Sequence, residues 1–238
     1  MPGTTGTTTL RAAALIAGLA ILMMTFAAPY AEIYVYPKLV VQGNAAETAG
    51  NIMANRQLFV SCIFGYLVTF LCDIVAAWAL FILFKPVHAT ISLLTAWFRL
   101  VYTVIALVAL LHLVTLLNLL GGAGGPATGE PGPLYAQVAL SLSAFRSGWS
   151  FGILFFGIHL CLLGFLVLRS SYIPAILGSL LIISGLGYLV STVGPFLFPG
   201  VNLHYAVYTF YGELIFMLWL LIRGYRIPEP DTQIGPQR

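Results

Sequence analysis

The sequence predicts an all-α integral membrane protein, a polytopic bundle of six transmembrane helices. The chain of 238 residues is 60% hydrophobic and only 7% charged, with a mean hydropathy of +0.99, whereas about a quarter of the residues are charged in soluble domains. Six of its stretches are apolar over roughly the 20 residues that a helix needs to cross a bilayer. A chain of this length has room for a single transmembrane domain over residues 1–238 and none for a separate soluble domain.

The six spans follow one another along the chain, and most end at a charged residue, proline or glycine. A helix is expected for each, because a backbone exposed to lipid must satisfy its own polar groups. The first ends at Pro29, the second at Lys85-Pro86 and the third at Gly121-Gly122. The fifth is broken near its end by Gly194-Pro195. The expected spans cover about 10–28, 58–84, 91–120, 144–168, 173–198 and 206–222.

The first span has an alternative interpretation as a secretory signal peptide. Small residues, Ala27-Ala28 and Ala31, surround Pro29 near a possible cleavage point. However, Arg11 is its single basic residue, and its apolar run is long for a signal. We therefore expect a retained anchor; cleavage would leave five spans.

Six crossings put both termini on one side of the membrane. Basic residues are more numerous on that side, and the positive-inside rule then places both termini in the cytoplasm. We expect a bacterial inner membrane, with the lipid bilayer as the main partner. The basic residues of the cytoplasmic side are Arg11, Lys85, Arg169, Arg223, Arg226 and Arg238, against Lys38, Arg56 and Arg146 on the other.

Four ionisable residues lie deep inside the apolar stretches at one common depth. Asp73 comes 12 residues before Lys85, and Arg99 comes about a dozen after the Lys85-Pro86 break. His159 and Glu213 each come 10 residues before the arginine that ends their span. At a rise of 1.5 Å per residue, all four lie roughly 15–20 Å from the same membrane face. We call Asp73, Arg99, His159 and Glu213 the central cluster.

Pairing is expected within the central cluster, because a charge at the centre of a bilayer costs about 2.5–3.5 kcal/mol. The simplest arrangement sets Arg99 against Asp73 on the neighbouring span, and His159 against Glu213. The helix faces of Asp73 and Arg99 also carry hydroxyl groups, so these faces should point to the interior. The cluster is neutral when His159 is protonated; otherwise one negative charge remains unless a carboxyl group takes up a proton.

The leading functional hypothesis is a non-enzymatic membrane protein whose central cluster binds or conducts a small solute or proton. The acids would accept a proton or cation, Arg99 would be a fixed counter-charge and His159 the switchable partner. Two alternatives stay open. The cluster can be purely structural, as in an accessory subunit of a membrane complex. It can also serve an intramembrane lipid-modifying enzyme, with His159 as general base and Ser184 as the serine nearest that depth.

No cofactor, metal or nucleic acid is predicted. The net charge of +3 is spread over the loops. The cysteines show no CxxC spacing, and His112, His204 and Glu130 form no recognised metal motif. Haem between His112 and His159 is excluded by an offset of roughly 18 Å along the membrane normal. Gly148 to Gly152 is a GxxxG match that intrachain packing or dimerisation would explain. Oligomeric state and substrate stay open.

Several short strings resemble a bacterial family of uncharacterised multi-pass proteins, the domain of unknown function 4386 family. Trp97 to Val101 resembles the motif of its third span, and Phe156 to Leu160 with Gly164 is similar to that of the fourth. The likeness covers about residues 10–222 in matching order. It implies a multi-span membrane protein without an established activity, and it supports the choice of Arg99, His159 and Glu213. The remaining matching strings are Ile173-Pro174, Leu177-Gly178, Gly185 to Tyr188, and Glu213 with Trp219 to Leu221.

Overall fold

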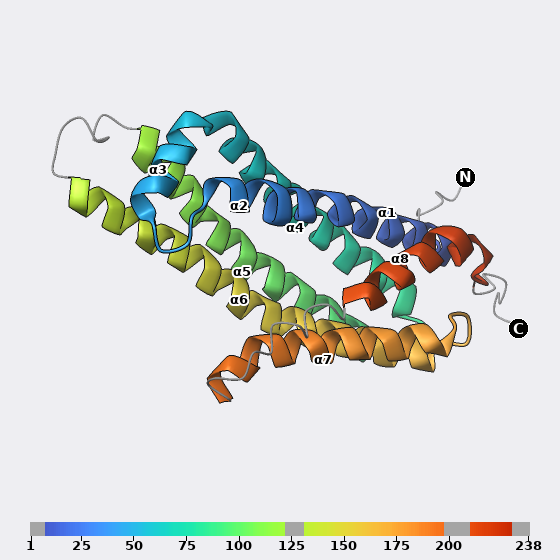
Figure 1. Cartoon of the computed structure of the whole chain (residues 1–238). Helices are drawn as coiled ribbons and strands as arrows, with labels where there is room; N and C mark the ends of the chain where they lie inside the picture. Colours follow the sequence, from blue (N-terminus) through green and yellow to red (C-terminus); the bar gives the residue numbers. More distant parts are fainter. Residues whose placement is uncertain (1–7, 122–130, 198–209, 230–238) are drawn as a thin grey trace, which may run out of the picture.

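Long helices dominate the computed structural model, which describes residues 8–121, 131–197 and 210–229. Every regular element within those ranges is helical, so the all-α prediction is confirmed. Figure 1 shows the long helices lying along one another, with the short α3 at one end and the start of α1 and the end of α8 at the other. The elements are α1 (Leu10–Pro29), η1 (Tyr30–Val35), α2 (Tyr36–Leu39), α3 (Ala45–Ala54), α4 (Arg56–Phe84), α5 (Ala89–Gly121), α6 (Pro131–Arg169), α7 (Ala175–Leu197), α8 (Tyr211–Arg223) and η3 (Gly224–Arg226).

Within the described ranges, five helical segments are long and apolar enough to cross a membrane, compared with the six that we expected. They are the continuous segment Leu10–Leu39, then Arg56–Phe84, Ala89–Gly121, Gly132–Arg169 and Ala175–Pro195. The expected sixth span corresponds to α8, whose 13 residues extend only about 20 Å. The remainder of that predicted span, 206–209, lies outside the described residues.

The first span does not end at Pro29, contrary to the sequence prediction. The helix passes through Pro29 into the π-helical η1 and then α2. In η1 the N–H of Tyr36 donates to the carbonyl of Ala31, five residues back. Wider π turns absorb the hydrogen bond that a proline removes. Ending the helix in lipid would instead expose several backbone groups, so continuation is the cheaper solution.

Antiparallel neighbours build the bundle. The most extensive contacts join α6 to α7, α5 to α6, α1 to α4 and α4 to α5. The connection between α6 and α7 is tied to the end of α4, since the Tyr172 hydroxyl donates to the carbonyl of Leu83 at 2.7 Å. Burial raises the pKa of Tyr172 to about 12, so this hydroxyl keeps its proton and remains a donor.

Glycines allow α6 and α7 to approach closely. A Cβ on Gly178 would lie 2.7 Å from the carbonyl oxygen of Gly164, and one on Gly185 would lie 2.6 Å from that of Gly157. The predicted GxxxG pair serves a similar purpose within the chain, because a Cβ on Gly148 would lie 2.9 Å from the Cβ of Ala109 on α5. The hydrophobic effect between helices is weak in lipid, so close backbone contact at small residues holds these helices together instead.

The two ends of the described chain meet at one end of the bundle. The carboxylate of Glu229 accepts hydrogen bonds from the backbone N–H groups of Leu10 and Arg11, each at 2.9 Å. Arg11 also donates from Nε to the carbonyl of Ile227 at 2.9 Å. Glu229 therefore caps the first turn of α1, whose N–H groups have no partner inside the helix.

Gly178→Ala should destabilise the bundle by about 1–3 kcal/mol, because the added methyl meets backbone that cannot rotate away. Thermal unfolding of the purified protein in detergent measures the change. Gly50→Ala in α3 is the matched control: no heavy atom lies within 4 Å of the added Cβ. It should be neutral or stabilise by up to about 1 kcal/mol. Equal unfolding temperatures for both variants would refute the close approach.

Acid should release the cap of α1. Partial desolvation raises the pKa of Glu229, but the hydrogen bonds from Arg11 and Leu10 outweigh it and leave this pKa below its ordinary value. Because the pKa of Glu229 is lower in the folded protein than in the unfolded chain, the ionised group stabilises the fold when the pH is above the unfolded-state pKa. This stabilisation disappears as the pH falls through the folded-state pKa. Glu229→Gln should therefore cost about 1 kcal/mol at neutral pH and nothing in strong acid. A loss that is independent of pH would contradict this role.

Candidate functional site

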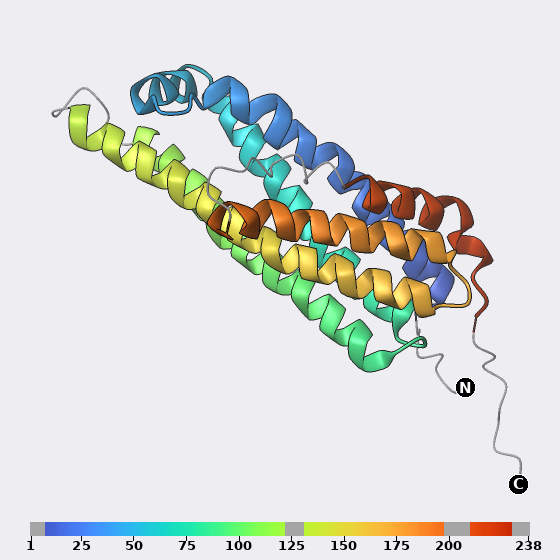
Figure 2. The same cartoon turned by 60° about the horizontal axis from the view of Figure 1, so that its bottom comes forward.

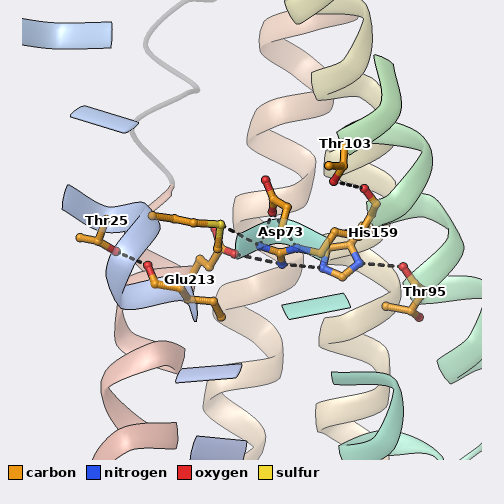
Figure 3. Close-up of polar contacts among 9 residues, drawn as sticks. Thr25, Asp73, Thr95, Thr103, His159 and Glu213 are labelled. Carbon is orange, nitrogen blue, oxygen red and sulfur yellow. Dashed lines mark hydrogen bonds and ion pairs between the residues drawn. The ribbon is translucent and has the colours of Figure 1, made fainter. Parts of the chain in front are cut away.

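The central cluster comes together from four helices. Asp73 lies on α4, Arg99 on α5, His159 on α6 and Glu213 in the first turn of α8, and Figure 3 shows them converging on one point. The hydroxyl-bearing faces of α4 and α5 are buried there, as predicted. The contacts of Arg99 with the other three residues place all four at one level of the bundle.

Arg99 is the hub of the central cluster. Its Nε donates to Oδ1 of Asp73 at 2.8 Å, and its Nη2 lies 2.7 Å from the same oxygen. Its Nη1 lies 3.1 Å from Nε2 of His159 and 3.4 Å from Oε1 of Glu213. The sulfur of Met24 on α1 lies 3.8 Å from Nη2. One guanidinium group thus contacts side chains from α1, α4, α6 and α8.

His159 does not pair with Glu213, so that predicted pairing is wrong. Instead, its Nδ1 lies 2.8 Å from the backbone carbonyl of Thr95, and its Nε2 faces Arg99. A carbonyl only accepts, so Nδ1 must carry the proton; a guanidinium only donates, so Nε2 must be bare. The geometry therefore requires a neutral His159 with its proton on Nδ1. The pairing failed because counting gives depth along a helix but not the direction in which a side chain points.

The charges of the central cluster do not cancel when both acids are ionised. Two carboxylates, Asp73 and Glu213, face a single guanidinium, because His159 is neutral. The cluster is therefore one proton or one monovalent cation short of neutrality. A net charge in a low-dielectric interior costs free energy, so the unbalanced negative charge favours binding of a proton or cation at this site.

Burial distinguishes Glu213 from the other members. Arg99 and His159 are 0% exposed and Asp73 is 2% exposed, whereas the side chain of Glu213 is 15% exposed. The Phe156 ring covers part of the centre, with the Cζ of Arg99 5.3 Å from its centroid. Glu213 is therefore the least buried member of the central cluster.

A second polar cluster lies nearer the other end of the bundle, and the sequence prediction missed it. Glu32 on η1 accepts hydrogen bonds from the Tyr66 hydroxyl on α4 and from Nη1 of Arg146 on α6. The Cζ of Arg146 also lies 4.0 Å from the centroid of the Tyr36 ring. We call Glu32, Tyr66 and Arg146 the outer cluster. Glu32 was missed because the first span was expected to stop at Pro29, which would leave Glu32 in a loop. Glu32 indicates a polar site within a span only if the helix continues past Pro29 to Leu39.

The remaining predicted candidates form no comparable site. Ser184 is buried and its Oγ donates to the carbonyl of Leu180 at 3.0 Å. The cysteines Cys62, Cys72 and Cys161 are free thiols. Across residues 8–121, 131–197 and 210–229, no three His, Cys, Asp or Glu side chains are grouped to hold a metal ion. His204 and Glu130 lie outside the described residues.

Arg99→Met should cost about 3–5 kcal/mol, because it leaves two buried carboxylates without their cation. Adding Asp73→Asn to that variant removes one of the orphaned charges, so the double variant should recover part of the loss. The expected coupling energy is about 0.5–3 kcal/mol, from denaturant or thermal unfolding in detergent. The control Arg169→Met removes an exposed arginine at the end of α6 and should change stability by less than about 0.5 kcal/mol. Strictly additive losses would show that Arg99 and Asp73 are energetically independent.

Comparison with known proteins identifies a family but no activity. The family described as "Domain of unknown function (DUF4386)" matches residues 16–224, a range that includes both polar clusters. An uncharacterised protein of Archaeoglobus fulgidus is 34% identical over 178 residues, which is 74% of this chain and 92% of the relative. No solved structure matches the chain. The chain therefore belongs to the DUF4386 family, as the strings around Arg99, His159 and Glu213 predicted.

Proposed function

We propose that this membrane protein takes up a proton or a small monovalent cation at its central cluster, with Glu213 as the accepting group. The observation that carries the proposal is the unequal charge: two buried carboxylates share one guanidinium, and the hydrogen bonds of His159 keep it neutral. A proton or a cation at Glu213 makes the cluster neutral. This changes the expected roles, since Glu213 rather than His159 is the switchable partner.

Glu213 is a better acceptor than Asp73. Asp73 receives two short contacts from Arg99, at 2.7 and 2.8 Å, whereas Glu213 receives one at 3.4 Å. Because this contact is weaker, the oxygens of the Glu213 carboxylate are more available to bind a cation or a proton. Among the described residues, the charged and titratable groups around it are Arg99 and Tyr102 from α5, Asp73 from α4, His159 from α6 and Tyr188 from α7.

The tightly filled centre favours a proton or small ion over a larger solute. Arg99 and His159 expose no surface, and the Phe156 ring packs on both of them. A solute of several heavy atoms would have to displace these groups, whereas a proton needs only a hydrogen-bonded route to Glu213. We therefore propose binding rather than an open conduit.

The enzyme alternative has less support. A general base needs a free nitrogen lone pair, but both ring nitrogens of His159 are engaged, by Thr95 and Arg99. Ser184 donates to its own helix instead of to His159. The observations thus favour binding over acyl transfer.

We also propose the orientation that places the end with both termini in the cytoplasm, in a bacterial inner membrane. In the described part of the chain that end carries Arg11, Lys85, Arg169, Arg223 and Arg226, while Lys38, Arg56 and Arg146 lie toward the other end. The positive-inside rule then assigns the cytoplasmic face.

Glu213→Gln tests the proposed acceptor. Proton uptake by the purified protein in weakly buffered detergent is measured between about pH 5 and pH 9, and the variant should bind about one proton fewer per chain than the wild type. Sodium or potassium should compete with that proton in the wild type and have no effect in the variant. Glutamine keeps an oxygen for Arg99, so folding should survive.

Glu229→Gln is the control, because the pKa of Glu229 lies below its ordinary value and its loss should leave the uptake in this range unchanged. Identical uptake by the wild type and Glu213→Gln would overturn the proposal and leave the central cluster a structural network.

A further inference from the structure

A second feature, separate from the central cluster, lies at the end of the bundle that carries the termini. A cavity of about 650 Å³ opens between the connection from α6 to α7 and the end of α8 with η3. Figure 2 shows these two segments side by side. Arg223 lies 10 residues from Glu213, roughly 15 Å along α8. We call this the basic cavity; it is lined by Ser171, Tyr172, Trp219, Arg223, Arg226 and Ile227, among others.

The basic cavity offers positively charged donors without a carboxylate among its lining residues. Arg223 and Arg226 are both exposed, and Arg226 uses only its Nε, which donates to the hydroxyl of Tyr225 at 2.8 Å. Arg223 has no hydrogen bond or ion pair with any described residue of the chain. Two guanidinium groups with spare N–H donors, beside the hydroxyl of Ser171, suit an oxyanion such as phosphate.

The charges around the basic cavity also favour an anionic ligand. The described residues at this end include five basic side chains, Arg11, Lys85, Arg169, Arg223 and Arg226, whereas the nearby acid Glu229 is held by the start of α1. The surplus of positive charge would draw an anion toward this surface.

Apolar groups form the rest of the basic cavity. Ile173 and Ile227 are buried in its floor, and the Trp219 ring forms part of its wall. The apolar side chains of Ile176 and Ile222 are exposed on the two helices beside it, where lipid tails would lie. A ligand that fits this lining has an anionic head and an apolar portion.

The depth of the basic cavity also suits a lipid. α6 ends at Arg169, α7 begins at Ala175 and α8 ends at Arg223, so three helices reach the bilayer surface around it. The phosphates of phospholipids lie at this level, and tryptophan and arginine are typical of it.

We propose that the basic cavity binds a phosphate ester anion, supplied by the headgroup of an anionic phospholipid, between Arg223, Arg226 and Ser171. The ligand would join the α6–α7 connection to the end of α8. This site is independent of proton or cation uptake at Glu213.

The test uses the full-length protein in a neutral detergent, with phosphatidylglycerol, phosphatidylcholine or inorganic phosphate added separately. Phosphatidylglycerol should raise the midpoint of thermal unfolding by about 2–4 °C, and native mass spectrometry should show one retained lipid. Arg223→Gln and Arg226→Gln should each weaken binding by roughly 10- to 100-fold. Both arginines are exposed, so folding should be unaffected.

Arg169→Gln is the matched control, since it removes an exposed arginine from the same end but outside the lining of the basic cavity. It should keep the phosphatidylglycerol effect. Stabilisation by inorganic phosphate that depends on Arg223 and Arg226 would support the phosphate site and name free phosphate as its source. The proposal is overturned if phosphatidylcholine stabilises as strongly as phosphatidylglycerol, if no addition shifts the midpoint, or if Arg169→Gln weakens binding as much as Arg223→Gln.

Discussion

A single guanidinium group, that of Arg99, joins most of the helices of this protein. A buried arginine in a membrane interior is unfavourable unless its donors are used, and the donors of Arg99 point toward groups on α1, α4, α6 and α8. Each helix that shifts out of register would leave one of those donors, or its partner, unsatisfied. The polar geometry around Arg99 therefore helps to specify the register of the helices at the bundle centre.

The close packing of α6 and α7 works together with that centre. Gly157 and Gly164 on α6 face Gly185 and Gly178 on α7, so these two helices form a closely fitted pair. His159 follows Gly157 by two residues and faces α5, where its ring nitrogens contact Thr95 and Arg99. The first turn of α8, which carries Glu213, is packed closely on α7 as well, because a Cβ on Gly212 would lie 2.5 Å from the carbonyl oxygen of Leu180.

The sequence predicted correctly which residues lie at one level of the bundle, but it did not predict the direction in which each side chain points. The helical rise is constant and the spans end at charged residues, so counting placed Asp73, Arg99, His159 and Glu213 at one level. It also gave the Arg99–Asp73 pair, because their helices are adjacent and antiparallel. The partner of His159 depended on rotation of α6 about its axis, which is decided by packing against α5 and α7. Glu32 was missed for a different reason: a proline usually ends a helix in water, but lipid makes continuation through Pro29 the better choice.

A series of aromatic rings in contact lies between the two polar clusters, which restricts how the central one can be reached. From Tyr66 of the outer cluster, rings follow through Phe70, Tyr102 and Phe156 to His159, with successive centroids 6.3, 6.5, 4.9 and 5.8 Å apart. Such spacing is direct van der Waals packing and leaves no room for a file of water between the rings. Water approaching from the end of the outer cluster would have to part several aromatic pairs, whereas Glu213 is already partly exposed. Because the aromatic rings resist that parting, access to the central cluster is expected beside α8, and the outer cluster holds η1, α4 and α6 together independently of it.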